Sequence, residues 1–542
     1  MLRAGKKIHA IVDANDGVSP VGQIGEYAGE GQNQGKFFDL ISFDPRGVGL
    51  SEPSIHCFQD RGMYESFNLR TMAEGILGSS DAALGRLWSM AHALGSSCAH
   101  TAEEDDIKMY VSTASSARDM LEIVERHGEW RGREAIRLYQ DGRDEPVGRS
   151  DVPEELRYEP GEEKIQYWGS SYGTFLGSTF AALFPDRIGR FVLDGVVDAE
   201  DYKQTLWYDN LLDTEKDMRT FYHHCARVGY PTCALASEGD TPDHIENKVR
   251  RITERLYHNP LPVIGPNPEV IEYSDAKNLI FAALYTPQAS FPYLATLLAE
   301  VDKGNGARFA ELLAQYHTYQ CDNRPPDAAL DALVPLRNKT ASTPLDTYAM
   351  LAIACGDGDS RQSENKTYFQ HHMDRLDKMS PTFGKIWAQI RLDCIGWKIR
   401  PKFRFTGPWQ ANTSHPILWI GNTADPVCPL ASAHKMAQGF PGSVVLTQDS
   451  PGHCSTSAFS RCSIGHIRAH FQTGALPPPG TICGADELPF GAGPDGKGVA
   501  ALDAAEVRLM EAHREVGRAV HLAGGGFMRN GMLGGRVRDG WW

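Results

Sequence analysis

The chain has 542 residues, of which 41% are hydrophobic and 23% are charged, proportions that are ordinary for a globular protein with more than one lobe. Its formal net charge of −15 argues against nucleic acid or an anionic membrane surface as a partner. No apolar run reaches the roughly 18 residues that a membrane-spanning helix needs, so no membrane segment is expected.

The N-terminal third contains one strong strand and one helix. Residues 1–35 are rich in Gly, Asn and Gln, show no sustained period, and form an atypical N-terminal segment. Residues 37–43 are almost continuously apolar, as expected of a strand buried on both faces. Apolar positions over 109–126 predict a helix, whereas the charged, Pro- and Gly-containing residues 127–163 predict a surface insertion.

A strand–turn–helix–strand pattern follows over residues 165–193, and such a βαβ unit requires a parallel sheet. Strand signals return at 417–420 and 444–446, after a mainly helical stretch that reads as a lid inserted between two halves of one sheet. We therefore expect an α/β-hydrolase fold with a mostly parallel sheet. The expected divisions are 1–35, core 36–200, helical cap or lid 201–395, core 396–490, and a tail 491–542 that contains one amphipathic helix.

Gly169-Ser-Ser171-Tyr-Gly173 fits the nucleophile elbow, in which a serine occupies a strained turn between a strand and a helix. Small residues are needed on both sides of such a turn. The pattern alone also fits an ordinary Gly-rich turn, but a buried strand precedes it and an apolar helix follows. This context favours Ser171 as a nucleophile.

The elbow predicts an acid and then a base after later strands. Asp425 follows the strand at 417–420, and His453 follows the strand at 444–446. His453 would take the proton of Ser171, and Asp425 would hold the imidazole in the required tautomer. The backbone N–H of Tyr172 would supply one oxyanion donor, and a loop after an earlier strand should supply the second.

Four stretches resemble the tripeptidyl aminopeptidase branch of the prolyl aminopeptidase family, a family of α/β-hydrolase serine peptidases. They are Ser42–Ser51 with its Asp-Pro-Arg-Gly turn, Gly169–Gly173, Asn422–Pro426, and Gly452-His453-Cys-Ser. The ending, from Gly474-Ala-Leu-Pro to Phe490, resembles the C-terminal domain of that branch. The resemblance implies a secreted exopeptidase that releases short peptides or single residues from free N-termini, and cap acids that bind the substrate's amine.

One departure concerns the start of the chain. The family carries a Gly-rich oxyanion loop upstream of the Asp-Pro-Arg-Gly turn, and residues 1–35 contain neither that loop nor a signal peptide. We expect an N-terminally incomplete chain. A catalytically impaired protein of the same fold is an alternative, because losing one oxyanion donor costs roughly 10²–10³ in rate.

The eleven cysteines favour an oxidising, secretory route, as do three glycosylation sequons at Asn338, Asn365 and Asn412. Spacing and the family resemblance together predict four disulfides, which leave Cys321, Cys428 and Cys454 over. Cys428 and Cys454 lie on the expected acid and base loops and could meet. The predicted pairs are Cys57–Cys98, Cys225–Cys233, Cys355–Cys394 and Cys462–Cys483.

The expected partners are peptides with free N-termini, bound through lid acids among which Glu215 and Asp217 are the candidates. A carboxylesterase or lipase with the same triad is the alternative, although the charged lid fits an apolar substrate less well. No cofactor is expected, and no His/Cys cluster has the spacing of metal ligands along the sequence.

Overall fold

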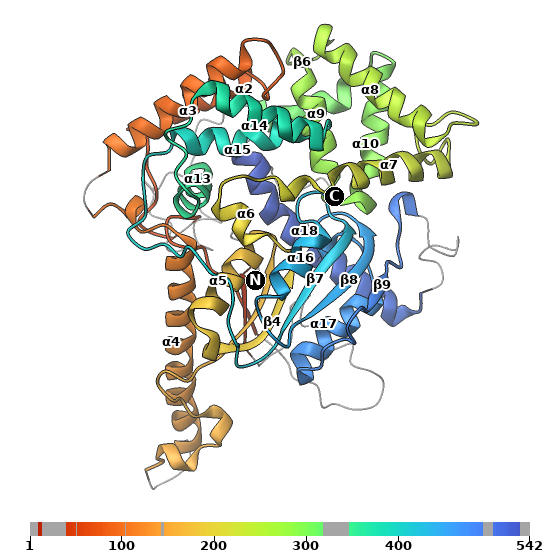
Figure 1. Cartoon of the computed structure of the whole chain (residues 1–542). Coiled ribbons are helices and arrows are strands. Elements are labelled where there is room, and N and C mark those ends of the chain that lie inside the picture. The colour runs from red at the N-terminus through yellow and green to blue at the C-terminus, as the bar shows by residue number, and fades with distance from the viewer. Residues whose placement is uncertain are drawn as a thin grey trace.

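We describe the fold from a computed structural model of the chain (Figure 1). The structure describes residues 9–13, 39–49, 51–102, 105–141, 146–317, 346–491 and 502–531.

The centre of the molecule is a seven-stranded sheet with the order β2-β1-β3-β4-β7-β8-β9. The five strands from β3 to β9 are parallel, and β1 pairs antiparallel with both β2 and β3. The predicted parallel α/β-hydrolase core is thereby confirmed. The strands are β1 (His9–Asp13), β2 (Asp39–Ile41), β3 (Ile165–Ser170), β4 (Ile188–Asp194), β7 (Ile417–Ala424), β8 (Val444–Pro451) and β9 (Ile482–Gly484).

The N-terminal strands differ from the sequence prediction. Residues 1–35 contain β1, a strand that was not predicted, and it pairs with the strand that precedes Ser171. The strand predicted at 37–43 is the three-residue β2, which lies at the edge of the sheet rather than buried on both faces. An apolar run shows that a segment packs against something, but it does not show its place in the strand order.

Helices α5, α16 and α17 pack against the sheet, and α4 packs against α5 (Figure 1). These helices are α4 (Thr113–Gln140), α5 (Tyr172–Leu183), α16 (Leu430–Ala437) and α17 (Arg461–Thr473). Their apolar faces and the strands form one large core, in which Phe180, Phe191 and Trp419 are completely buried. This packing fixes the strand ends at which the functional side chains lie.

Helix α4 is longer than predicted and extends as a projecting arm (Figure 1). The segment that read as an insertion from 127 onward continues the helix to Gln140. Ion pairs one turn apart support its exposed surface, as between Arg126 and Glu122 and between Arg133 and Glu129. Charge and scattered Gly predict exposure well, but they do not by themselves end a helix.

A second, helical layer covers the carboxyl ends of the parallel strands (Figure 1). It contains helices from the predicted lid and also two helices from the first core segment. Helices α3 and α15 approach so closely that a Cβ on Gly95 would lie 1.9 Å from the carbonyl oxygen of Gly396. The helices are α2 (Arg61–Ala73), α3 (Ala83–His100), α6 (Ala199–Lys203), α7 (Thr214–Val228), α8 (Pro242–His258), α9 (Tyr273–Ala283), α10 (Pro287–Asp302), α11 (Ala307–His317), α13 (Asp346–Asp357), α14 (Lys366–Met379) and α15 (Gly384–Gly396), with a hairpin of β5 (Leu261–Val263) and β6 (Glu269–Ile271).

The C-terminal tail contains α18 (Ala504–Gly531), in agreement with the predicted amphipathic helix. Its buried residues Leu509, Met510 and Val516 pack with Phe459 and Ile464 of the core. None of the described helices is both long enough and apolar enough to span a membrane.

All four predicted disulfides are confirmed: Cys57–Cys98, Cys225–Cys233, Cys355–Cys394 and Cys462–Cys483. Cys428 and Cys454 are both buried and free, so the suggested contact between them produces no disulfide. Cys321 and the Asn338 sequon lie outside the described residues. Of the other two sequons, Asn412 is exposed, whereas the side chain of Asn365 caps α14 by accepting the N–H of Tyr368 at 2.9 Å.

Candidate active site

Ser171 lies on the sharp turn between β3 and α5. Its backbone has φ +57° and ψ −123°, a conformation that L residues rarely adopt. The turn is as crowded as a nucleophile elbow requires, because a Cβ on Gly169 would lie 2.5 Å from the carbonyl oxygen of Gly173. The sequence therefore places a glycine where no side chain fits and a serine at the strained position.

Asp425 and His453 meet at the same edge of the sheet, beyond β7 and β8. The Nδ1 atom of His453 is 3.0 Å from each carboxylate oxygen of Asp425. The backbone N–H of His453 donates to the carbonyl of Tyr285 at 3.1 Å, and the Tyr285 ring packs edge-on against the imidazole at 5.0 Å. The imidazole is thus held by a carboxylate and an aromatic ring, and the backbone of His453 is fixed by the carbonyl of Tyr285.

The Asp425 carboxylate is completely buried and collects three further donors. The backbone N–H groups of Val427 and Cys428 donate to Oδ1 at 3.0 and 2.8 Å, and that of Cys454 donates to Oδ2 at 2.9 Å. These three backbone donors, together with the imidazole, fix the orientation of the Asp425 carboxylate.

The turn of Ser171 and the loop of His453 are joined through Asp194 and Gly195, at the end of β4. The carbonyl of Asp194 accepts the N–H of Ser171 at 2.9 Å. A Cβ on Gly195 would lie 2.4 Å from Sγ of Cys454, the residue after His453, so a larger residue does not fit there without a shift. Ser171, Asp425 and His453, which are far apart in sequence, consequently gather at one sheet edge.

The side chain of Asp194 is a further buried carboxylate beside this site. It accepts the backbone N–H of Ser455 at 2.8 Å and its hydroxyl at 2.6 Å. Burial raises the pKa of Asp194 to about 6, and the hydrogen bonds from Ser455 partly oppose that rise. Asp194 therefore ties the base loop to the strand next to the elbow.

Two further groups of the site bear on proton transfer at Ser171: the Nε2 atom of His453 and the thiol of Cys428. Among the described residues, Nε2 of His453 is buried and has no hydrogen-bond partner. The side chain of Ser171 is within hydrogen-bonding reach of the Cys428 thiol, whose pKa burial nevertheless raises well above its ordinary value. Cys428 therefore lies beside Ser171 as a neutral thiol.

Tyr172 occupies the first position of α5, where a backbone N–H has no acceptor within the helix and lies at the positive end of the helix dipole. Its phenol is hydrogen bonded to the hydroxyl of Thr113, which in turn donates to the buried carboxylate of Asp357. This chain of hydrogen bonds anchors the residue whose N–H is predicted to face the oxyanion. Residues 14–38, which follow β1, lie outside the described residues.

The two predicted amine-binding acids lie on α7 but have different surroundings. Both oxygens of Glu215 accept hydrogen bonds from Ser380 and Thr382, at 2.6 to 3.0 Å. Asp217 is completely buried, and its Oδ2 has no partner among the described residues. Burial, and to a lesser extent the charge of Asp425, raise the pKa of Asp217 well above its ordinary range.

Side chains that could coordinate a metal come together where the sequence spacing did not predict them. Donor atoms of Asp425, Cys428 and His453 lie within 4.8 Å of one another, as do those of Cys462, His466 and Cys483. Cys462 and Cys483 form a disulfide, and Asp425 already holds the imidazole of His453. The disulfide and the Asp425–His453 hydrogen bond therefore explain why these side chains lie together, without a metal.

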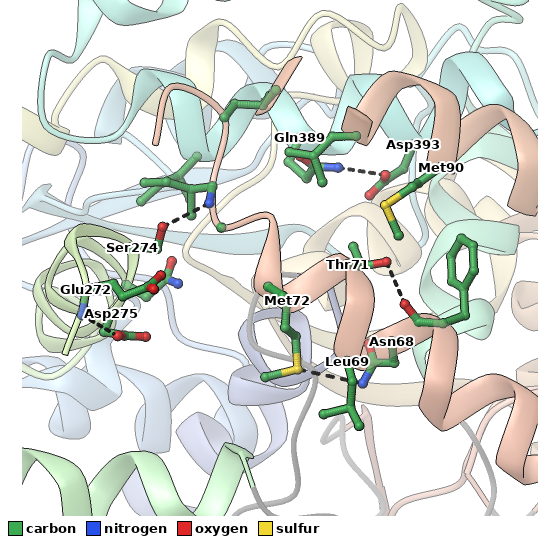
Figure 2. Close-up of a pocket in the computed structure, with 18 of the residues that line it drawn as sticks. Asn68, Leu69, Thr71, Met72, Met90, Glu272, Ser274, Asp275, Gln389 and Asp393 are labelled. Atoms are coloured by element: carbon green, nitrogen blue, oxygen red, sulfur yellow. Dashed lines mark hydrogen bonds between the residues drawn. The ribbon is translucent and has the colours of Figure 1, made fainter. Parts of the chain in front are cut away.

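A separate cavity of about 350 Å³ lies within the helical layer (Figure 2). Ser171, Asp425 and His453 are not among the described residues that line it. Its walls come from α2, α3, α9, α13 and α15, so it belongs to the helical cover rather than to the strand ends.

Residues 380–483 match the family model described as TAP-like protein. The chain has an α/β-hydrolase fold with a TAP-like domain. The matched segment runs from the end of the helical cover through Asp425 and His453 to the strand β9.

Three curated relatives are similar over most of the chain. A tripeptidyl aminopeptidase of Streptomyces coelicolor is 24% identical over 463 residues, which cover 84% of this chain and 72% of that protein. The serine protease Hip1 of Mycobacterium tuberculosis is 23% identical, covering 82% and 74%, and carboxylesterase B of the same organism is 24% identical, covering 83% and 74%. These relatives support a serine hydrolase.

Sequence reasoning missed several residues around the site. Asp194 read only as the end of a strand, and Tyr285 belongs to the lid segment, far from the motifs in sequence. A signal existed for Asp194, because it ends a parallel strand at the edge where such sites form. No local signal marks Tyr285, whose contact with His453 exists only in the folded chain.

Proposed function

We propose that this chain is a serine exopeptidase that releases short peptides or single residues from free N-termini. Ser171 would attack the scissile carbonyl, and Nε2 of His453 would take its proton and pass it to the leaving amine. Asp425 would stabilise the imidazolium, and water would then hydrolyse the acyl-enzyme.

One observation carries the proposal: a serine with φ +57° at a strand-to-helix turn, at the same sheet edge as a buried Asp–His pair. The strained turn presents the hydroxyl away from the helix, and the pair supplies a base with a fixed tautomer. The Nε2 atom of His453 has no hydrogen-bond partner among the described residues, so it is available to accept the Ser171 proton.

The N–H of Tyr172 is the first oxyanion donor in this proposal, supported by its place at the start of α5. The second donor is expected from a loop after an early strand. If the chain has no such loop, its turnover would be lower by roughly 10²–10³. This is the catalytically impaired alternative.

The helical layer over the strand ends supports an exopeptidase, because a cover of this kind can limit how much substrate extends beyond the cleavage site. An ammonium entering a partly dry cleft needs a carboxylate to offset its desolvation. Asp217 suits that task better than Glu215, because one oxygen of Asp217 has no partner and both oxygens of Glu215 are occupied.

Carboxylesterase is the second candidate, and the similarity to carboxylesterase B favours it. The same triad cleaves esters and amides through the same acyl-enzyme, so the site geometry does not separate them. Recognition of the substrate's amine does separate them.

The first test asks whether Ser171 is the nucleophile. A fluorophosphonate probe should label the full chain covalently, and Ser171→Ala should abolish the label. Ser170→Ala is a matched control, since Ser170 is the neighbouring serine at the end of β3. Persisting label in Ser171→Ala protein would refute the assignment.

The second test compares kcat/KM for a peptide amide with a free N-terminus and for its N-acetylated form, with a short-chain ester as a third substrate. Losing one desolvated charge contact should cost about 2–5 kcal/mol, a fall of roughly 30-fold to several thousand-fold on acetylation. Equal rates for the two amides would favour the esterase or an endopeptidase.

We also propose a secretory route for this protein. The four disulfides support it, because such bonds persist in oxidising compartments. Mass spectrometry of the protein purified from its host, without reduction, would test it: free thiols at all eight positions would contradict the route.

A further inference from the structure

The cavity in the helical layer has an apolar interior and an acidic lining. Its deep walls come from buried side chains such as Leu77, Leu87, Leu351 and Ile386. Leu69 and Val270, which also line it, are exposed, so the cavity opens to the surface on the side of α2 and β6. Its volume of about 350 Å³ lies within the range of small-molecule sites.

Four carboxyl groups face this space: Glu269, Glu272, Asp275 and Asp393. The described lining contains one basic group, His317, and neither lysine nor arginine. His317 is already paired with Glu269, at 3.0 Å. The lining therefore carries an excess of negative charge within low-dielectric walls, where electrostatic interactions are strong.

Asp393 is the acid that most needs a partner. Its one hydrogen-bond donor among the described residues is the side-chain amide of Gln389, one turn earlier on α15, at 2.9 Å (Figure 2). Burial raises the pKa of Asp393 to about 7. A carboxylate with a single neutral donor has its ionised form poorly compensated, and a bound cation would supply the missing charge.

Asp275 lies at the other side of the cavity, at the start of α9 (Figure 2). Its carboxylate accepts the N–H of Glu272 at 2.7 Å and lies 4.0 Å from Nε2 of His317. Burial raises the pKa of Asp275 to about 6. Two separate elements thus direct poorly compensated acids toward one apolar space.

We propose that this cavity is a binding site for a small amphipathic amine, whose ammonium pairs with Asp393 or Asp275 while its hydrocarbon part fills the apolar walls. An anion would meet uncompensated carboxylates, and a neutral molecule would leave Asp393 without its counter-charge. The inference does not rest on the proposed hydrolase activity, because the triad takes no part in it.

Isothermal titration of the full chain with phenylbutylamine tests the proposal, with phenylbutanol and phenylbutanoate as probes of the same shape and different charge. We expect the amine to bind at least about tenfold more tightly than the alcohol, the worth of one hydrogen bond to a charged group. The carboxylate probe should bind most weakly. Equal affinity for amine and alcohol would overturn the proposal.

Asp393→Asn should weaken amine binding by about tenfold or more and leave alcohol binding unchanged. Asp374→Asn is a matched control, because Gln370 and Asp374 form the same one-turn pair on the exposed surface of α14. Asp275→Asn is the second variant, used if Asp393→Asn lowers the melting temperature. Amine affinity that survives in both variants would overturn the proposal.

Ser171→Ala protein should bind phenylbutylamine with the affinity of the unchanged chain. This variant separates the two hypotheses: a chain without hydrolase activity can still show the amine site, and an active chain can lack it.

Discussion

Two aspartates, the completely buried Asp425 at the strand ends and the partly buried Asp393 in the helical layer, show how differently this molecule treats a carboxylate. Asp425 receives three backbone N–H groups in addition to the imidazole of His453. Asp393 receives one side-chain amide from its own helix. The first is surrounded by donors from two loops, and the second faces a cavity.

The difference follows from the secondary structure. Loops at the ends of parallel strands have backbone N–H groups that no ladder uses, and these groups converge on a side chain placed among them. A helix consumes its own N–H groups, so an acid on its side depends on neighbouring side chains. Asp425 at the strand ends is therefore oriented by backbone donors, whereas Asp393 in the helical layer is left to take up a proton or a cation.

The largest expected effect is on kcat, and it comes from breaking the Asp425–His453 pair. Asp425→Asn and His453→Ala should each lower kcat by about 10³–10⁴-fold, because the imidazole loses its tautomer or is absent. Both variants should keep the circular dichroism of the unchanged protein. Near-native turnover in either variant would mean that another carboxylate or histidine serves the nucleophile.

The next effect concerns the pH dependence of stability at Asp393. Its pKa is raised from 3.8 to about 7, so between these values the folded chain binds more protons than the unfolded chain. The contribution of Asp393 to stability is therefore present at low pH and is lost as pH rises toward about 7. Asp393→Asn should be more stable than the unchanged chain at about pH 8, by on the order of a few kcal/mol, and similar near pH 4.

Chemical denaturation at both pH values measures this difference. Asp374→Asn, with its exposed carboxyl, should show no such pH-dependent gain. If the unfolding free energies of Asp393→Asn and of the unchanged protein differ by the same amount at both pH values, the cavity compensates the Asp393 carboxylate better than its hydrogen bonds indicate.

A smaller effect is expected from Asp194, whose carboxylate holds the N–H and hydroxyl of Ser455. Asp194→Ala leaves a buried N–H without an acceptor, which costs about 1–3 kcal/mol of unfolding free energy. Because Ser455 lies two residues after His453, kcat should fall more than KM changes. Wild-type kcat in this variant would mean that the base loop is held without Asp194.

The smallest effect on stability is expected from ion pairs that are exposed to solvent. Arg461 pairs with Asp486 at 2.8 Å and also with Glu506, and this partly exposed group joins the starts of α17 and α18. Arg461→Met should change the unfolding free energy by less than about 1 kcal/mol, since exposed ion pairs contribute little. A larger loss, measured by urea denaturation, would show that α18 depends on these contacts.

The sequence predicted the parts of the molecule that have local signals. The elbow and the two loops after later strands each combine a residue type with a short-range context, whereas the four cysteine pairs also needed the family resemblance. The hydrogen bonds that compensate Asp425, and the contact between His453 and Tyr285, join segments that are remote in sequence. Strand β1 was missed because only three apolar residues lie between its polar ends, His9 and Asp13, which is too short a pattern to stand out.

The cavity was equally invisible to sequence reasoning. Gln389 and Asp393 read as ordinary polar positions of a helix, and their counterparts Gln370 and Asp374 have the same spacing on an exposed face. The packing of α3 against α15, which places Gln389 and Asp393 at the cavity, distinguishes the two pairs. Burial of an acid is a tertiary property, and a single helix pattern does not specify it.

The order of the elements has a consequence for how the protein matures during synthesis. Strands β4 and β7 are neighbours in the sheet, yet residues 195–416 separate them in the chain. A ribosome therefore completes the strand and turn of Ser171, and then most of the helical layer, before it produces Asp425 or His453. The nascent chain carries its nucleophile without a base until β7 and β8 have added to the sheet, so hydrolytic activity, on the triad proposed above, would arise only in the final stage of folding.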